Sequence, residues 1–160
     1  MRLGRAAAYG MLALMTLARR DGDSPPRRAR HNGNGTNGKS SVAAAHEIAR
    51  ATGVPVEYLR KIMQRLSRAR IVRSERGRAG GFSLRVPAHR ITLLQVVEAI
   101  EGPIDEVAIF DDPLLRRSHD PLHRHLKRWR DTATMRLREM LSETTLNDIV
   151  EQSRERKART

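Results

Sequence analysis

Long cationic side chains gather on one face of the segment that spans residues 54–68. Apolar residues recur there at intervals of three and four, which predicts a helix with one buried stripe. The stripe consists of Leu59, Ile62, Met63 and Leu66. The opposite face carries seven polar residues, five of them long donors that reach phosphates or base edges: Glu57, Tyr58, Arg60, Lys61, Gln64, Arg65 and Arg68. The chemistry of this face is the binding of a polyanion.

A second, shorter helix is predicted immediately before this one, over residues 45–51. Ala45, Ile48 and Ala49 share one face of it. Gly53 follows where the helix must end and the chain must turn sharply. Pro55 suits the first turn of the next helix, because its missing N–H is not needed there. Two helices joined by so tight a turn indicate a helix-turn-helix that holds DNA.

A basic, glycine-rich hairpin follows the two helices. Residues 71–74 and 82–86 are predicted as short strands, and the turn between them contains Gly77, Gly80 and Gly81. Glycine supplies positive φ angles and lets the backbone approach a phosphate closely. Three arginines bring positive charge to the same place: Arg73, Arg76 and Arg78. The hairpin is therefore interpreted as a wing. Arg78, at its tip, is expected to lie in or beside a minor groove.

The donors of the second helix are expected to have different roles. Arg60 and Lys61 are expected to contact guanine edges. Arg65 and Arg68 are expected to contact phosphates. Tyr58 contacts a phosphate, stacks on a base, or alternatively packs its ring against the wing. The predicted DNA-binding set is Pro55, Glu57, Tyr58, Arg60, Lys61, Arg65, Arg68, Arg76, Arg78 and Gly80, with Arg65 and Arg68 on phosphates.

The net positive charge of the chain lies in its first half. The 160 residues include 31 Lys and Arg against 18 Asp and Glu. Residues 1–90 hold 19 basic and 5 acidic side chains, a net charge of +14. Residues 91–160 hold 12 basic and 13 acidic side chains, a net charge of −1. The first half therefore faces the polyanion. A membrane is the poorer partner, because no apolar run approaches the roughly 20 residues of a spanning helix.

The N-terminal segment is apolar but lacks the pattern of a signal peptide. Arg19 and Arg20 follow the apolar residues 11–18, and no small-residue cleavage site is clear. We expect a cytoplasmic protein. The same segment fits a helix over residues 5–20. Its buried face is expected to contain Ala8, Met11, Leu12, Met15 and Ala18.

A chain of 160 residues is expected to form one compact domain with an extension. Residues 1–103 are assigned to a winged helix-turn-helix domain, which ends in a helix over residues 92–101 stopped by Gly102 and Pro103. The apolar face of that helix is Leu93, Val96, Val97 and Ile100. Residues 21–41 are predicted to be a disordered insertion, either a tolerated surface loop or an arm that adds phosphate contacts.

Three further segments follow. Residues 104–121 are predicted to form a loop. Residues 122–152 are predicted to form a long helix, which ends at about residue 141, and a second, short helix. Residues 153–160 are predicted to be a flexible tail. The long helix carries an apolar stripe close to a coiled-coil repeat: Leu122, Leu126, Trp129, Ala133, Leu137 and Met140. This stripe packs either on its own domain or on a second copy, and we expect the second. The fold class is mainly α with a small β wing.

The order of these features resembles the Rrf-two family of bacterial transcription regulators, also called BadM-type or IscR-like. The resemblance rests on an N-terminal helix with Tyr9, the segment AHEIARATGVPVEYLRKIMQRLSRARIV, the wing RGRAGGFSL, the helix ITLLQVVEAIEGP and a long C-terminal helix. The wing with the EAIEGP end is its most specific part. The resemblance implies a homodimer that binds pseudo-palindromic operators and dimerises through the long helix.

Many members of that family hold an iron-sulfur cluster with three cysteines before the long helix. This chain has no cysteine, so thiolate ligands are absent and no cofactor is expected. The resemblance matches His123 to a histidine ligand and places Asp120 where a cysteine is expected. A non-thiolate metal remains an alternative to solvated histidines paired with acids. Its candidate ligands are Asp111, Asp112, His119, Asp120, His123 and His125.

Two other classes of function fit the sequence less well. An enzyme needs an open metal site, a nucleophile with its base, or a phosphate-cradling motif, and none of these accompanies the segment HDPLHRH. An architectural or RNA-binding protein needs only basic charge, whereas Tyr58, Arg60 and Lys61 stand at base-reading positions. We therefore expect a sequence-specific, DNA-binding transcriptional repressor without catalytic activity.

Overall fold

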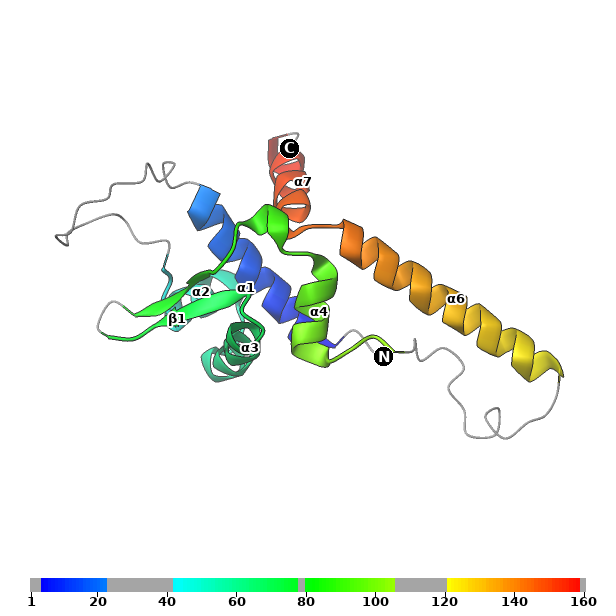
Figure 1. Cartoon of the computed structure of the whole chain (residues 1–160). Coiled ribbons are helices and arrows are strands. Elements are labelled where there is room, and N and C mark those ends of the chain that lie inside the picture. Colours follow the sequence, from blue (N-terminus) through cyan, green and yellow to red (C-terminus); the bar gives the residue numbers. More distant parts are fainter. Residues whose placement is uncertain (1–3, 23–41, 78–79, 106–120, 159–160) are drawn as a thin grey trace.

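The computed structural model describes residues 4–22, 42–77, 80–105 and 121–158. Its elements are, in chain order, α1 (Arg5–Gly22), α2 (Ala45–Thr52), α3 (Val56–Arg68), β1 (Val72–Glu75), β2 (Gly81–Leu84), η1 (Ala88–Arg90), α4 (Leu93–Glu101), α6 (Pro121–Glu143) and α7 (Leu146–Ala158). A mainly α fold with a small β sheet is thereby confirmed. Figure 1 shows a body that consists of every element except α6, which projects from it.

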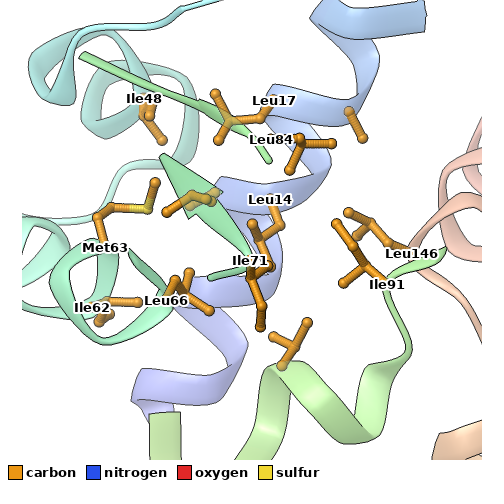
Figure 2. Close-up of a cluster of buried hydrophobic side chains, with 14 of the residues drawn as sticks. Leu14, Leu17, Ile48, Ile62, Met63, Leu66, Ile71, Leu84, Ile91 and Leu146 are labelled. Atoms are coloured by element: carbon orange, nitrogen blue, oxygen red, sulfur yellow. The ribbon is translucent and has the colours of Figure 1, made fainter. Parts of the chain in front are cut away.

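Helix α1 forms the centre of the main hydrophobic core. Its Leu14 and Leu17 are fully buried, and they contact side chains from both ends of the sequence (Figure 2). The surrounding side chains include Ile48 of α2, Met63 and Leu66 of α3, Ile71, Leu84 of β2, Ile91 and Leu146 of α7. The body is therefore organised around α1, and α2 and α3 are fixed by the contacts that they make with it.

The predicted N-terminal helix is confirmed, but its predicted buried face is wrong. Of the five residues assigned to that face only Ala18 is buried, while Ala8 and Leu12 are exposed. Met11 and Met15 are partly buried. Apolar residues occur almost all round this helix, so periodicity alone did not distinguish the side that other elements cover. That side contains Ala7, Gly10, Ala13, Leu14, Leu17 and Ala18.

Helices α2 and α3 form the predicted helix-turn-helix. Gly53 ends α2 with a φ of 72°, a left-handed conformation that strains any residue with a side chain. Helix α3 begins at Val56, so Pro55 is its N-cap and lies just outside the first turn to which it was assigned. The predicted buried stripe of α3 is confirmed, because all four of its residues are at most 2% exposed.

The wing is the hairpin formed by β1 and β2. The strands pair antiparallel, with Val72 opposite Leu84, and their ends lie within two residues of the predicted ones. An extended segment before α2 joins them, since Ala43 and Phe82 exchange two backbone hydrogen bonds of 2.8 Å each. Gly81 is needed at this junction, because a Cβ would lie 2.3 Å from the carbonyl oxygen of Ala43. The wing is therefore attached directly to the start of α2.

Helix α4 ends in the EAIEGP sequence, and this end connects three other helices. Glu101 Oε1 accepts a hydrogen bond of 3.1 Å from a backbone N–H in the first turn of α1. Arg65 of α3 donates a hydrogen bond to the carbonyl oxygen of Ile100. Glu98 Oε1 lies 2.5 Å from Nη1 of Arg138 in α6. The part of the sequence that most specifically carries the family resemblance is thus a junction between helices.

Helix α6 joins the body through its C-terminal half. Leu141 is buried with Val97 and Ile104 in a small second cluster. The chain then returns to the body, where Leu146 N–H donates to the carbonyl oxygen of Ile91 at 2.8 Å and Val150 is buried in the main core. Helix α7 is therefore packed within the body, although the sequence grouped it with the long helix.

Helix α7 extends into the segment predicted as a flexible tail, residues 153–160. Helix α7 continues to Ala158, and Ser153 Oγ accepts a hydrogen bond of 2.8 Å from Arg19 Nη2 of α1. The charged sequence after Ser153 has no apolar periodicity. Its helix extends from a first turn that the core already holds, and such propagation is far easier than starting a helix.

Several predicted features lie outside the described residues. These are residues 23–41 of the insertion, residues 106–120 of the loop, and Arg78 at the wing tip. Residues 21 and 22, which were assigned to the insertion, belong to α1. Among the helices that the structure describes, none combines the length and apolar character needed to cross a membrane.

Candidate nucleic-acid interface

The face of α3 opposite the core is exposed along the whole helix. All seven polar residues predicted on this face are solvent-accessible, from Glu57 at one end to Arg68 at the other. Because four side chains on the other face are buried, the donors extend from a helix that cannot easily shift. The structure thus presents together the residues that the sequence assigned to base and phosphate contacts.

Arg60 is held only weakly by its own helix. Its Nε lies 3.8 Å from Oε1 of Glu57, one turn earlier, and both side chains are exposed. An exposed ion pair of this length contributes little to stability. Arg60 can therefore leave Glu57 for a base edge at small cost, and Lys61 is exposed beside it.

Tyr58 packs on a different partner from the one considered in the sequence. Its ring meets that of Tyr9 in α1 edge to face, with centroids 5.8 Å apart and an interplanar angle of 86°. The alternative in which it packs against the wing is therefore wrong. The residue is still 39% exposed, and its contact with DNA stays a prediction.

Arg65 has a structural contact that periodicity did not indicate. Its Nη1 donates to the carbonyl oxygen of Ile100 at a distance of 2.5 Å. The last carbonyls of a helix lack intrahelical partners and attract cations, which explains why a guanidinium group ends up here. Arg65 therefore ties α3 to α4, and its predicted phosphate contact would compete with this bond.

A groove of about 700 Å³, here called the α3–wing groove, lies between α3 and the hairpin. Its α3 side is formed by Arg60, Gln64, Ser67 and Arg68. Its hairpin side is formed by Ser74, Glu75, Gly77, Gly80, Gly81 and Phe82. The first turn of α2 completes the lining with Ala44, Ala45 and His46. Of the predicted DNA-binding residues, the structure brings Arg60, Arg68 and Gly80 into this one concave surface.

Of the three wing glycines, Gly77 has the predicted conformation, whereas Gly80 and Gly81 differ from the prediction. Gly77 does adopt a positive φ, of 110°. Gly80 is needed for close packing, because a Cβ would lie 2.5 Å from the carbonyl oxygen of Glu75. Gly81 belongs to β2 and not to the turn.

The arginines of the wing also differ in their surroundings. Arg73 Nε donates to Ser83 Oγ on the neighbouring strand at 2.9 Å and lies 3.7 Å from Glu75 Oε1. Arg73 is therefore engaged within the sheet. Arg76 is exposed at the turn, where a phosphate contact stays a prediction.

The first turn of α2 contributes a residue that the sequence did not single out. His46 is exposed and lines the α3–wing groove. Its neighbour Glu47 points to α1, where its Oε2 lies 2.7 Å from Arg20 Nη1, and this hydrogen bond holds the pKa of Glu47 below its ordinary value. Apolar periodicity marks only the buried side of α2, so it gave no reason to choose His46. The available signal was its place in the first turn of α2, the helix that precedes α3.

The candidate ligands do not fit the iron-sulfur cluster of the resemblance. No cysteine occurs in the 160 residues, so thiolate ligands are missing. Within the described ranges, no three His, Cys, Asp or Glu side chains are grouped as a metal site. His123 lies in α6, and its buried Nδ1 has no hydrogen-bond partner among the described residues. Asp111, Asp112, His119 and Asp120 fall outside the described residues.

The predicted stripe of α6 is largely uncovered in the single chain. Leu122, Trp129 and Met140 are 61%, 55% and 56% exposed. Leu126 and Ala133 are partly buried. Leu137, by contrast, packs on the second cluster of its own body. Three of the six stripe residues are therefore exposed, which leaves room for a second copy.

A helix-turn-helix with an exposed basic second helix, followed by a wing that shares a groove with it, defines a winged helix-turn-helix DNA-binding protein. The model of the Rrf2 family, described as an iron-dependent transcriptional regulator, matches residues 35–152. The chain belongs to the Rrf2 family, which is the Rrf-two family of the sequence resemblance. It is accordingly a DNA-binding regulator of transcription.

Individual relatives agree with this assignment. The HTH-type transcriptional regulator CymR of Bacillus subtilis is 29% identical over 150 residues, which cover 93% of this chain and 89% of CymR. The HTH-type transcriptional regulator IscR of Cereibacter sphaeroides is 28% identical over 105 residues, or 66% of this chain and 58% of IscR. The structure of oxidized Staphylococcus aureus CymR matches with a TM-score of 0.62 and 26% identity, over 94% of this chain and 97% of that one. The structure of B. subtilis CymR, described as the global cysteine regulator, matches with a TM-score of 0.68 and 24% identity. The match covers 95% of this chain and 98% of that chain.

Proposed function

We propose that the protein is a homodimeric repressor that binds a pseudo-palindromic DNA operator. In each subunit α3 enters the major groove and the wing reaches the adjacent minor groove. The observation that carries the proposal is the α3–wing groove, in which Arg60 and Arg68 share one concave surface with the backbone of the hairpin. The charge of the first half, +14 over residues 1–90, supplies the attraction to DNA.

The open stripe of α6 supports the dimer. Apolar residues at close to a 3.5-residue spacing are usually covered by another helix. Pairing α6 with its copy about a two-fold axis would cover Leu122, Trp129 and Met140 in both subunits. The same axis would present two α3 helices to two half-sites, which is why the operator is proposed to be pseudo-palindromic.

Repression requires only that the dimer occupies DNA at a promoter, so no catalytic step is part of the proposal. The relatives named above are all described as regulators of transcription. The proposal includes no iron-sulfur cluster, because this chain supplies no thiolate to hold one. It places the protein in the cytoplasm, together with its DNA.

The proposal is tested by selecting genomic fragments on the purified protein and then measuring affinity for the selected duplex and for a scrambled duplex of equal length. At one fixed salt concentration the selected duplex should bind at least about a thousandfold more tightly. A ratio near one would indicate an architectural protein instead. Repeating the titration with a chelator should leave the affinity unchanged, whereas a loss would indicate a non-thiolate metal.

A further inference from the structure

The α3–wing groove lies where a phosphodiester strand has to pass. This inference rests on the proposed function. On a DNA duplex, a major groove and the adjacent minor groove are separated by one backbone strand. A subunit that places a helix in the first and a hairpin in the second must accommodate that strand between the two elements. The α3–wing groove occupies this position, and its volume is about 700 Å³.

Small residues keep one side of this groove open. Ala44 is the N-cap of α2 and Ala45 its first residue, while Gly80 directly precedes Gly81, the first residue of β2. The backbone hydrogen bonds between Ala43 and Phe82 hold these two segments together. His46 is therefore the residue with a long polar side chain in the part of the lining that α2 contributes.

The acidic groups near His46 already have arginine partners. Glu47, its neighbour on α2, accepts a hydrogen bond from Arg20 of α1. Glu75 of β1 lines the groove, and Arg73 Nε lies 3.7 Å from its Oε1. Glu47 is therefore engaged by Arg20, whereas Glu75 has a long, exposed pair with Arg73.

The cationic groups near His46 leave the groove in need of an anion. Arg60 and Arg68 of α3 line it together with His46, and Arg50 is exposed one turn further along α2. The charged group with which His46 interacts electrostatically is Glu47, which already accepts a hydrogen bond from Arg20. An anion in the groove would satisfy the imidazole and both arginines of α3 together, and a DNA phosphate is such an anion.

We infer that His46 binds a phosphate of the strand in the α3–wing groove and makes operator affinity dependent on pH. Histidine ordinarily changes charge near pH 6.5, and a phosphate favours its protonated form. The added affinity is therefore present at lower pH and is lost as the pH rises through the neutral range. Because the dimer has two such residues, both half-sites respond.

The test compares operator affinity at about pH 6 and about pH 8 at constant ionic strength, because histidine titrates within this range. Between these values the unchanged protein should lose roughly tenfold in affinity per subunit, the typical value of a charged hydrogen bond. His46→Gln should be weak at both pH values. His46→Lys keeps a positive charge and should bind tightly at both. His89→Gln is the matched control, since His89 is exposed in η1 and does not line the groove.

The contacted phosphate can be located with operators that carry a single neutral methylphosphonate. At one position per half-site, on the strand between the major and minor grooves, the neutral linkage should abolish the difference between His46→Gln and the unchanged protein. A pH profile that His46→Gln leaves unaltered overturns the inference while the proposed function stands. No preference for any DNA by the unchanged protein at either pH overturns the proposed function, and this inference with it.

Discussion

Three arginines on the outer face of α3 are equivalent in the sequence pattern but not in the structure. Arg60 lines the α3–wing groove with only a long, exposed ion pair to Glu57. Arg65 is bound to the carbonyl oxygen of Ile100, and Arg68 lines the groove at the far end of the helix. Substitution of Arg60 or Arg68 should therefore change DNA affinity, whereas substitution of Arg65 should also change the free energy of unfolding.

Replacing Arg60 with alanine should remove a base contact. Arg60→Ala is expected to cost about 1 to 3 kcal/mol on the operator and to relax base preference at one position. Arg68→Ala is the matched control, which should weaken all sequences alike and lower the salt slope by about one. Titrations of operator and random duplexes at several salt concentrations measure both effects. Equal losses on the two duplexes for Arg60→Ala would contradict its assignment.

Replacing Arg65 with alanine should affect folding as well as binding. Loss of its hydrogen bond to Ile100 is expected to lower the free energy of unfolding by about 1 kcal/mol. Urea denaturation monitored by circular dichroism measures this change. Lys61→Ala, on the same exposed face, should leave the unfolding free energy unchanged. If Arg65→Ala were as stable as the control, the link between α3 and α4 would be of no importance.

Residue roles could be predicted from the sequence only where they depend on a single element. Periodicity correctly separated the buried stripe of α3 from its exposed donors. It gave no indication that Ile100 would lie beside Arg65 or Tyr9 beside Tyr58, because these partners come from distant parts of the chain. His46 was missed for the same reason, since its importance arises from the hairpin that packs next to α2.

At the scale of elements, the first turn of α2 is stabilised by an ion pair with α1. The hydrogen bond from Arg20 lowers the pKa of Glu47 from its ordinary value of 4.5. A carboxyl group with a lowered pKa in the folded state contributes stability above its unfolded pKa. That contribution is lost as the pH falls through the lower, folded value. The pair also keeps Glu47 away from the α3–wing groove.

Glu47→Gln should therefore be less stable than the unchanged protein at about pH 7, and the difference should disappear at about pH 3. Thermal unfolding at the two pH values measures this pattern. Arg20→Gln, which removes the other partner, should reproduce it. A difference of equal size at both pH values would show that packing, and not the charge of Glu47, is responsible.

Elements with one-sided apolar patterns were predictable, and elements that depend on tertiary contacts were not. Helices α3 and α4 each have one apolar face and a glycine or turn at their ends, so sequence rules located them closely. Helix α1 is apolar almost all round, and its buried side depends on which elements cover it. The length of α7 depends on a first turn anchored in the core and on the bond between Ser153 and Arg19.

At the scale of the whole molecule, the DNA-binding body and the projecting α6 are separate surfaces. Figure 1 shows α6 extending away from the sheet and α3, so an α6 pair and a bound duplex need not compete for the same face. The body contains the α3–wing groove, while α6 carries most of the large exposed apolar side chains. This division fits a dimer in which α6 sets the spacing of two recognition helices.

Replacing the exposed tryptophan of α6 should weaken the dimer. Trp129→Ala is expected to cost about 2 kcal/mol or more of association energy, roughly thirtyfold in the dimer dissociation constant. Sedimentation equilibrium measures that constant. Lys127→Ala, exposed on the same helix but outside the stripe, is the matched control and should leave it unchanged. A dimer unaffected by Trp129→Ala would place the subunit contact elsewhere.

A hydroxyl-radical footprint of the selected operator shows directly how a subunit sits on a duplex. Two protected regions related by two-fold symmetry are expected, each centred on the backbone strand between a major groove and its neighbouring minor groove. The protection should weaken in Arg68→Ala and His46→Gln without moving. A single unsymmetrical region, or even protection along the whole fragment, would contradict the proposed binding of DNA by a symmetric dimer.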